Sequence, residues 1–189
     1  TEPQPEPEQS PPHNHRAQGT GENEWYTPAK YVELAREVLG NIDLDPASSD
    51  AANEVVGADC YFTEADDGLG QTWAGRIFLN PPYAQPAILH FVDKLASEVG
   101  AGNVTEAILL THNYTDTRWF HRAASACSAI CFTSGRINFQ RYDGQTGSPT
   151  QGQAFFYFGE DVDSFAKRFR EIGLIVFTGS PSVGKGGAE

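Results

Sequence analysis

The chain has 189 residues, a length that fits one domain built around a single hydrophobic core. Its 39% apolar content is that of a globular protein, and no apolar run approaches the roughly 20 residues that cross a bilayer, so we expect a soluble protein without membrane contact. The formal net charge is −12, and it stays at about −8 without residues 1–24, which excludes a broad basic surface. Contact with DNA would need a local basic patch, for which the candidates are Arg118, Arg122, Arg136 and Arg141.

Both ends of the chain are poor in apolar residues. Residues 1–23 are mostly Pro, Glu, Gln, Ser, Asn and Gly, and residues 179–189 are rich in Gly, so we predict a disordered N-terminal arm and a disordered C-terminal tail around one domain at 24–178. The start lacks the basic and apolar regions of a secretory signal, which predicts a cytoplasmic protein. Cys127 and Cys131 have no second pair of ligands, so we interpret them as buried thiols and expect no metal.

The first predicted element is a helix that ends at Gly40. Thr27 is the expected N-cap, Pro28 occupies the first helical position, and an apolar stripe at helical spacing follows. A short strand at 42–45 then ends at Pro46, and a polar stretch at 47–53 predicts a short helix. Residues 60–62 predict a second strand.

Strands and helices then alternate. We predict strands at 76–79, 106–111 and 128–133, with helices at 86–99 and 116–125 between them, which indicates βαβ units and a mainly parallel α/β sheet. In such sheets ligands bind at the carboxyl ends of the strands. Segments 137–139 and 154–158 flank a long polar loop and predict an antiparallel hairpin, and a helix at 161–172 and a strand at 174–177 close the domain.

The most informative motif is Asn80-Pro81-Pro82-Tyr83, which follows the strand at 76–79 directly. An exocyclic amine on an aromatic base is a poor nucleophile because its lone pair is delocalised into the ring. The side-chain oxygen of Asn80 and the main-chain carbonyl of Pro81 are two acceptors for such an amine, and the prolines hold them in place. Tyr83 is placed to stack on a base that has left the double helix. These four residues are the predicted catalytic motif.

Four ordered blocks of the sequence resemble a known family. They are Trp25 to Pro28, Ile42 to Ser48, Asp66 to Leu69, and Asn80 to Tyr83. Together they are similar to the small phage and prophage DNA adenine-N6 methyltransferases, which are Dam-like enzymes with an Asn-Pro-Pro-Tyr motif. The resemblance implies a Rossmann-like class I fold that transfers a methyl group from S-adenosylmethionine to adenine in DNA, without a metal, in the cytoplasm of a bacterial host.

The resemblance also implies where the cofactor and the DNA bind. Cofactor contacts fall on Tyr26, Thr27, Pro28, Asp45, Pro46, Ala47, Asp66, Asp67 and Asn80. The loop after Asp45 has Ala47, Ser48 and Ser49 where methyltransferases in general have glycines. We expect Tyr83, Arg118, Arg136 and Gln151 to contact DNA, with Gln145 and Gln153 as further candidates to read adenine edges.

Two alternatives remain open. Similar Asn-Pro-Pro-Tyr motifs serve enzymes that methylate glutamine in proteins or guanine in RNA, and all of these acceptors are planar nitrogens. A non-catalytic relative that only binds nucleic acid or cofactor would also keep the fold. The sequence leaves the recognition site open, and it does not distinguish a monomer from a weak dimer.

Overall fold

The central feature of the fold is a seven-stranded sheet with the order β2-β1-β3-β4-β8-β5-β9. The structure is a computed structural model, and it describes residues 26–140, 146–147 and 150–179. The sheet strands are β1 (Leu44–Asp45), β2 (Cys60–Tyr61), β3 (Gly75–Leu79), β4 (Val104–His112), β5 (Ala129–Thr133), β8 (Gln153–Phe158) and β9 (Gly173–Phe177). A separate two-stranded sheet pairs β6 (Phe139–Gln140) with β7 (Thr146–Gly147).

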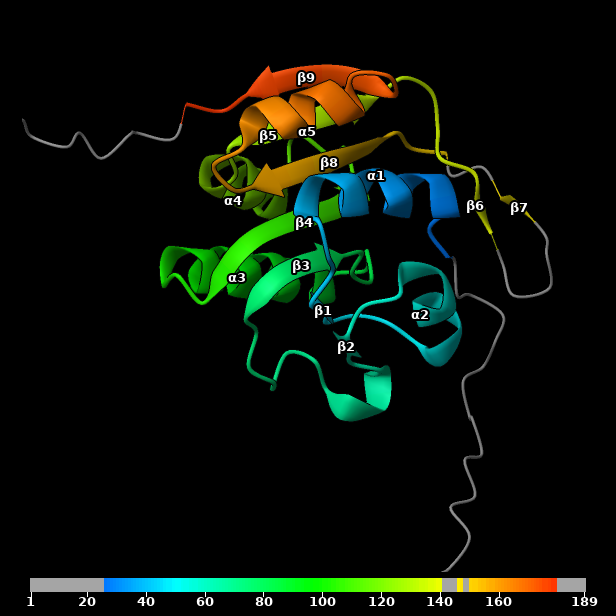
Figure 1. The fold of residues 1–189 in the computed structure, drawn as a ribbon, viewed down its shortest axis with the longest axis vertical. Helices are drawn as coiled ribbons and strands as arrows, with labels where there is room; N and C mark the ends of the chain where they lie inside the picture. The colour runs from blue at the N-terminus through cyan, green and yellow to red at the C-terminus, as the bar shows by residue number, and fades with distance from the viewer. Residues whose placement is uncertain (1–25, 141–145, 148–149, 180–189) are drawn as a thin grey trace, which may run out of the picture.

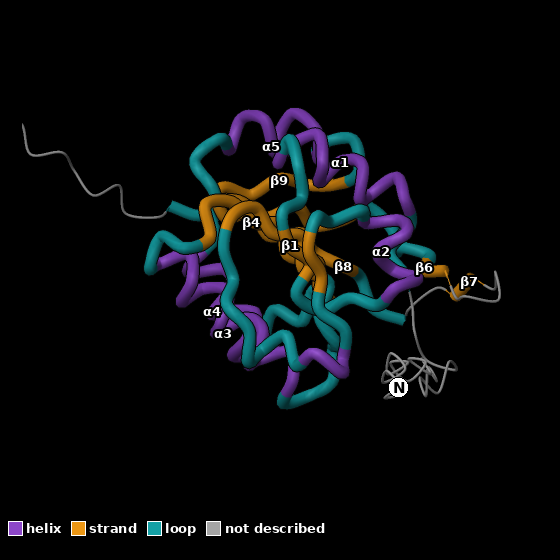
Figure 2. The backbone as a smooth tube through the Cα atoms, turned by 60° about the horizontal axis from the view of Figure 1, so that its bottom comes forward, coloured by secondary structure: helices purple, strands orange, loops and turns teal. Residues whose placement is uncertain are grey.

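Helices cover both faces of the large sheet (Figures 1 and 2). One layer holds α1 (Ala29–Leu39) and α5 (Val162–Phe169), and the opposite layer holds α3 (Ala87–Gly100) and α4 (Arg118–Ala126). The short helix α2 (Asp50–Val56) follows β1, and a 3-10 turn, η1 (Glu64–Asp66), follows β2. Two hydrophobic clusters result, one on each side of the sheet.

Five strands of the sheet run in the same direction, as the alternation of elements predicts. β1 is parallel to both β2 and β3, and β3 is parallel to β4. β5 runs the same way, because β8 lies between β4 and β5 and is antiparallel to both. The carboxyl ends of β1, β3, β4 and β5 therefore lie at one edge of the sheet, where a ligand is expected.

The antiparallel part of the sheet differs from the predicted hairpin. Segment 154–158 does not pair with 137–139: it belongs to β8, which pairs with β4 and β5, while Phe139 pairs with Gly147 in the small sheet. All six residues of β8 are buried, and consecutive residues such as Phe155 and Phe156 pack into the hydrophobic clusters on opposite faces of the sheet. A strand that is apolar on both faces belongs in the interior of a sheet covered by helices on both sides.

The predicted helices are present with shifts at their ends: the helix predicted at 161–172 ends at 169, and the one predicted at 47–53 spans 50–56. α1 begins at Ala29, with Pro28 at the N-cap position and no side-chain cap, so the predicted capping role of Thr27 is wrong. α2 begins at Asp50, because the hydroxyl of Ser49 accepts a hydrogen bond from Ala52 N at 3.2 Å and forms the cap. Thr117 caps α4 in the same way, with Phe120 N as the donor at 3.3 Å.

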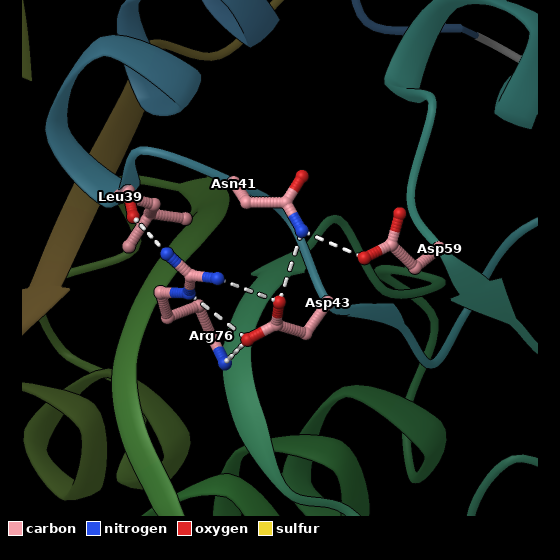
Figure 3. Close-up of polar contacts among 5 residues, drawn as sticks. All are labelled: Leu39, Asn41, Asp43, Asp59 and Arg76. Atoms are coloured by element: carbon pink, nitrogen blue, oxygen red, sulfur yellow. Dashed lines mark hydrogen bonds and ion pairs between the residues drawn. The ribbon is translucent and has the colours of Figure 1, made fainter.

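An ion pair joins β1 to β3 at the amino edge of the sheet, away from the expected site (Figure 3). Arg76 Nη2 lies 2.9 Å from Asp43 Oδ1, and Arg76 Nε donates to Asp43 Oδ2 at 2.9 Å. The main-chain N of Arg76 also donates to Oδ2, at 2.8 Å, and Asn41 donates to Oδ1 at 3.0 Å. These contacts, with the Arg76 side chain contributing most, lower the pKa of Asp43 to about 2. The network fixes the register of the two strands that carry the site at their other ends.

The Cys127 and Cys131 thiols are buried, as predicted, and the Cys60 thiol is exposed. In the part of the chain that the structure describes, every helix is too short or too polar to cross a membrane.

Candidate active site

The ends of β1, β3 and β4 meet around a cavity of about 940 Å³. Asp45 is the last residue of β1, Asn80 follows β3, and His112 is the last residue of β4. The residue types that line the cavity are mixed, with carboxylates, amides and aromatic rings beside small side chains. Its volume is within the range of small-molecule sites, roughly 300–1,000 Å³.

Asn80 is held by two side chains on opposite sides of its amide. Its Nδ2 donates to the hydroxyl of Thr27 at 3.0 Å, and its Oδ1 accepts from the hydroxyl of Tyr83 at 2.6 Å. Thr27 is only 7% exposed, so this contact lies inside the protein. The two bonds set which end of the amide is the acceptor, and Oδ1 keeps a second lone pair for a further donor.

Tyr83 packs against the end of β4. Its ring meets the ring of His112 edge-on, with centroids 4.2 Å apart, and its hydroxyl also lies 3.5 Å from the carbonyl oxygen of Leu110. Burial raises the pKa of Tyr83 well above its usual 10, so the phenol stays protonated and acts as a donor. Burial likewise lowers the pKa of His112, which favours its neutral form.

Asp45 is a buried carboxyl group at the wall of the cavity. It is 3% exposed, and its Oδ1 accepts a hydrogen bond from Ala47 N at 3.2 Å. Burial raises its pKa to about 6, while hydrogen bonds from Ser48 and Ala47 oppose the shift. A cation bound beside this group would favour its ionised form.

Two loops form the wall next to Asp45, and they touch at Gly68. A Cβ atom on Gly68 would lie 2.1 Å from the carbonyl oxygen of Pro46, so only glycine fits this approach. Trp73, which is fully buried, donates its indole N–H to the carbonyl of Gly68 at 2.8 Å and holds the loop from the other side. Gly68 therefore allows the loop after β1 and the loop after β2 to approach closely beside Asp45.

Comparison with known protein families decides what kind of site this is. The family model for DNA N-6-adenine-methyltransferase (Dam) matches residues 16–158, which is most of the chain and includes every residue that lines the cavity. The chain belongs to the Dam family. A comparison with curated proteins finds none that matches it. Adenine in DNA is therefore favoured over protein glutamine and RNA guanine as the acceptor.

Most of the cofactor residues predicted by resemblance to the family lie at the cavity. Tyr26, Thr27, Asp45, Pro46, Ala47, Asp67 and Asn80 all line it. Two do not: Pro28 is the N-cap residue of α1, and Asp66 accepts hydrogen bonds from the main chain and side chain of Thr63 at 2.8 and 2.7 Å. Two other acidic residues of this loop, Glu64 and Asp67, line the cavity.

All four residues of the predicted catalytic motif, Asn80, Pro81, Pro82 and Tyr83, line the cavity. Of the predicted DNA contacts, Gln151 lines the cavity as well. Gln153 does not fit its predicted role: it is fully buried, accepts from Ile137 N at 2.8 Å, and donates to the carbonyl of Gln151 at 2.8 Å. Gln145 lies outside the described residues.

Among the described residues, none of the arginines predicted to contact DNA lines the cavity. Arg118 and Arg136 are exposed and follow β4 and β5 at the carboxyl edge. Arg118 borders a second, more open hollow between α3 and α4 together with Arg122, whose Nε lies 3.3 Å from Asp93 Oδ1. The charge of Arg122 is thus partly neutralised, and Arg141 lies outside the described residues.

His112 lines the cavity, although the sequence analysis did not select it as a site residue. The available signal was its position at the end of a predicted strand next to the strand that carries Asn80. Phe139 and Gly147 also line the cavity, which brings the small β6-β7 sheet to the site. Within the described ranges, no cluster of three or more His, Cys, Asp or Glu side chains is arranged for a metal ion.

Proposed function

We propose that this protein transfers a methyl group from S-adenosylmethionine to the exocyclic amine of an adenine that has left the DNA double helix. The observation that carries the proposal is the Asn80 amide, held by Thr27 and Tyr83 at the rim of a cavity between β1 and β3. The match to the Dam family supports adenine in DNA as the acceptor. Bound S-adenosylmethionine would supply an electrophilic methyl group on a sulfonium.

The residues present fit such a cofactor. S-adenosylmethionine carries positive charge, and the buried carboxylate of Asp45 is a counter-charge in a place where water competes little. The small side chains of Ala47 and Ser48 and the contact between Gly68 and Pro46 give the cavity wall its shape. Asp67, on the same wall, would accept hydrogen bonds from hydroxyl groups of the nucleoside part.

The adenine amine would meet two fixed acceptors. Asn80 Oδ1 has one lone pair engaged by Tyr83 and one free, and the carbonyl of Pro81 follows directly in the chain. Hydrogen bonds to these oxygens draw the amine toward a tetrahedral geometry and return its lone pair to nitrogen. The acceptors are in position before substrate binds, so little reorganisation is needed during the reaction.

Tyr83 would hold the face of the extruded base. Its ring contacts the His112 ring edge-on, and its phenol stays protonated because burial raises its pKa, so it cannot take a proton from the amine. Asn80 is not a base either. The amine loses its proton after methyl transfer, so the chain supplies position and electrostatics and needs no residue that titrates in the first step.

The test compares wild type with Asn80→Ala, using unmethylated DNA and S-adenosylmethionine labelled in its methyl group. Loss of the amide acceptor should lower kcat by about 10²–10³-fold, the cost of removing one preorganised hydrogen-bonding group, while leaving cofactor affinity nearly unchanged. Equal turnover by Asn80→Ala would eliminate the mechanism. The matched control is Asn103→Ala, which removes an exposed amide that contacts only Glu98 in the described structure.

A further inference from the structure

Among the described residues, Tyr114 is an exposed aromatic residue that reaches Tyr83 through a single intervening ring, and the proposed function assigns it no role. It lies in the loop that joins β4 to α4, at the carboxyl edge of the sheet, and it is 38% exposed. Its ring contacts His112 with centroids 5.3 Å apart, and His112 in turn contacts Tyr83. The three rings form a continuous series that runs from the cavity to the surface.

The Tyr114 ring is supported by rigid structure. It meets the ring of Trp119 edge-on, with ring centroids 6.5 Å apart, and Trp119 is only 3% exposed. The carbonyl of Tyr114 accepts hydrogen bonds from the main chain and hydroxyl of Thr117 at 3.1 and 2.8 Å. On the other side of the loop, Asn113 N donates to the carbonyl of Gly152 at 3.0 Å. A ring held in this way loses little conformational entropy when it binds a flat ligand.

We propose that Tyr114 is a stacking subsite for the DNA base next to the target adenine. The inference rests on the proposed function, because it takes the adenine to lie against Tyr83. When one base leaves the double helix, the neighbouring base loses a stacking partner. The exposed Tyr114 ring is separated from Tyr83 only by His112, so it can stack on that neighbouring base in place of the lost partner.

The charge of the protein favours a contact of this kind. At −12 overall, the chain has little general attraction for phosphates, and exposed Asp116 lies two residues from Tyr114. Stacking is insensitive to this charge and accepts any base, because every base has an aromatic face. The exposed Arg118, at the start of the following helix, is the nearest cation in the chain sequence for the adjoining phosphate.

The test measures steady-state kinetics of the full chain with unmethylated plasmid DNA for Tyr114→Ala, Tyr114→Phe and the control Phe177→Ala. Phe177 is 57% exposed on β9, the far edge strand of the sheet, so its replacement also removes an exposed ring. Tyr114→Ala should raise KM for DNA about tenfold, with KM for S-adenosylmethionine and the melting temperature unchanged. Tyr114→Phe keeps the ring and should match wild type, as should Phe177→Ala.

Three results would overturn the inference: an unchanged KM for DNA in Tyr114→Ala, an equal loss in Tyr114→Phe, or a fall in melting temperature and kcat that accounts for the loss. Fluorescence anisotropy with a labelled 24-base-pair duplex, read without turnover, separates this failure from failure of the proposed function. Tyr114-dependent binding without methylation would remove the proposed function and keep the stacking subsite. Methylation that does not change when Tyr114 is replaced would keep the proposed function and remove the stacking subsite. A wild type that neither binds nor methylates DNA would overturn the proposed function and the stacking subsite.

Discussion

Thr27 and Asn80 are 53 residues apart in the sequence, yet the Asn80 amide donates a hydrogen bond of 3.0 Å to the Thr27 hydroxyl. This contact fastens the segment before α1 to the loop after β3. It also turns the amide so that Oδ1 faces Tyr83 and the cavity. Thr27, which the sequence analysis assigned to a helix cap, therefore holds the amide that is the proposed acceptor for the adenine amine.

The first prediction follows from this bond. Thr27→Val keeps the shape of the side chain and removes the hydroxyl, which leaves the amide free to turn. We expect kcat to fall about tenfold, in line with the loss of one hydrogen bond. Thr27→Ser restores the hydroxyl and should recover most of kcat. The measurement is steady-state kinetics with DNA and S-adenosylmethionine, and equal rates for the valine and serine variants would show that the hydroxyl does not position Asn80.

The second prediction concerns the pH dependence set by Asp45. Burial raises its pKa to about 6 from its usual 3.8, so the folded state without cofactor favours the neutral carboxyl. The neutral Asp45 carboxyl therefore contributes fully to the free energy of unfolding below pH 3.8, the pKa in the unfolded chain. This contribution is lost as the pH rises through about 6, because the carboxyl then ionises in the folded state. Asp45→Asn should remove this part of the pH dependence, and melting curves from about pH 4 to about pH 7 measure it.

The same variant tests the role of Asp45 toward the cofactor. Because the carboxylate is the proposed counter-charge, Asp45→Asn should weaken binding of S-adenosylmethionine, and in wild type the affinity should rise with pH as Asp45 ionises. Isothermal titration calorimetry at several pH values gives both quantities. A wild-type affinity that is flat across this range would contradict the assignment.

The third prediction concerns the contact between Gly68 and Pro46. An alanine at position 68 would place its Cβ 2.1 Å from a carbonyl oxygen, so one of the two loops must move. We expect Gly68→Ala to lower the free energy of unfolding by about 1–3 kcal/mol and to weaken cofactor binding. Gly100→Ala is the matched control, since a Cβ there meets nothing within 4 Å. Chemical denaturation and cofactor titration distinguish the two variants, and unchanged cofactor affinity in Gly68→Ala would separate this contact from the site.

The fourth prediction concerns the network at the opposite edge of the sheet (Figure 3). The lowered pKa of Asp43, about 2 against its usual 3.8, means that its stabilising contribution is present above pH 3.8 and is lost as the pH falls toward 2. Asp43→Asn should lower the free energy of unfolding at pH 7 by about 1 kcal/mol, a modest value because both partners are about one-third exposed.

A more exposed ion pair provides the control for Asp43. Arg168 and Glu37 form a contact of 3.0 Å in which both side chains are nearly half exposed, so Glu37→Gln should change stability by much less. Urea denaturation at pH 7 and at about pH 3 compares the two variants. If Asp43→Asn loses as little as Glu37→Gln, the network does not stabilise the strand register.

Local patterns predicted those parts of the fold that depend on neighbours in the chain. The strand that runs into Asn80 and the helix after it could be predicted because apolar runs, prolines and helical spacing are all local signals. The place of β8 between β4 and β5 could not be predicted from the sequence. A mostly apolar segment indicates a buried strand, but it does not show which strands it will pair with. The predicted hairpin failed for this reason.

Some residues of the candidate site could likewise be predicted from the sequence, whereas the contacts between them could not. Asn80 to Tyr83 and Asp45 could be chosen from the sequence because motif and resemblance both mark them. The Thr27 bond to Asn80 and the ring contact between His112 and Tyr83 join separate elements, and no local pattern encodes such contacts. Gln153 shows the opposite error, because a polar side chain in a polar loop can still be buried to satisfy main-chain groups such as Ile137 N.

The most direct test of the central claim is the identity of the methylated base. Purified protein is incubated with unmethylated DNA and S-adenosylmethionine carrying a labelled methyl group, and the DNA is then digested to nucleosides and analysed by mass spectrometry. The account predicts label in N6-methyladenine alone, at a rate that falls with Asn80→Ala. Label in another nucleoside, or none in DNA under conditions where the protein binds S-adenosylmethionine, would contradict it.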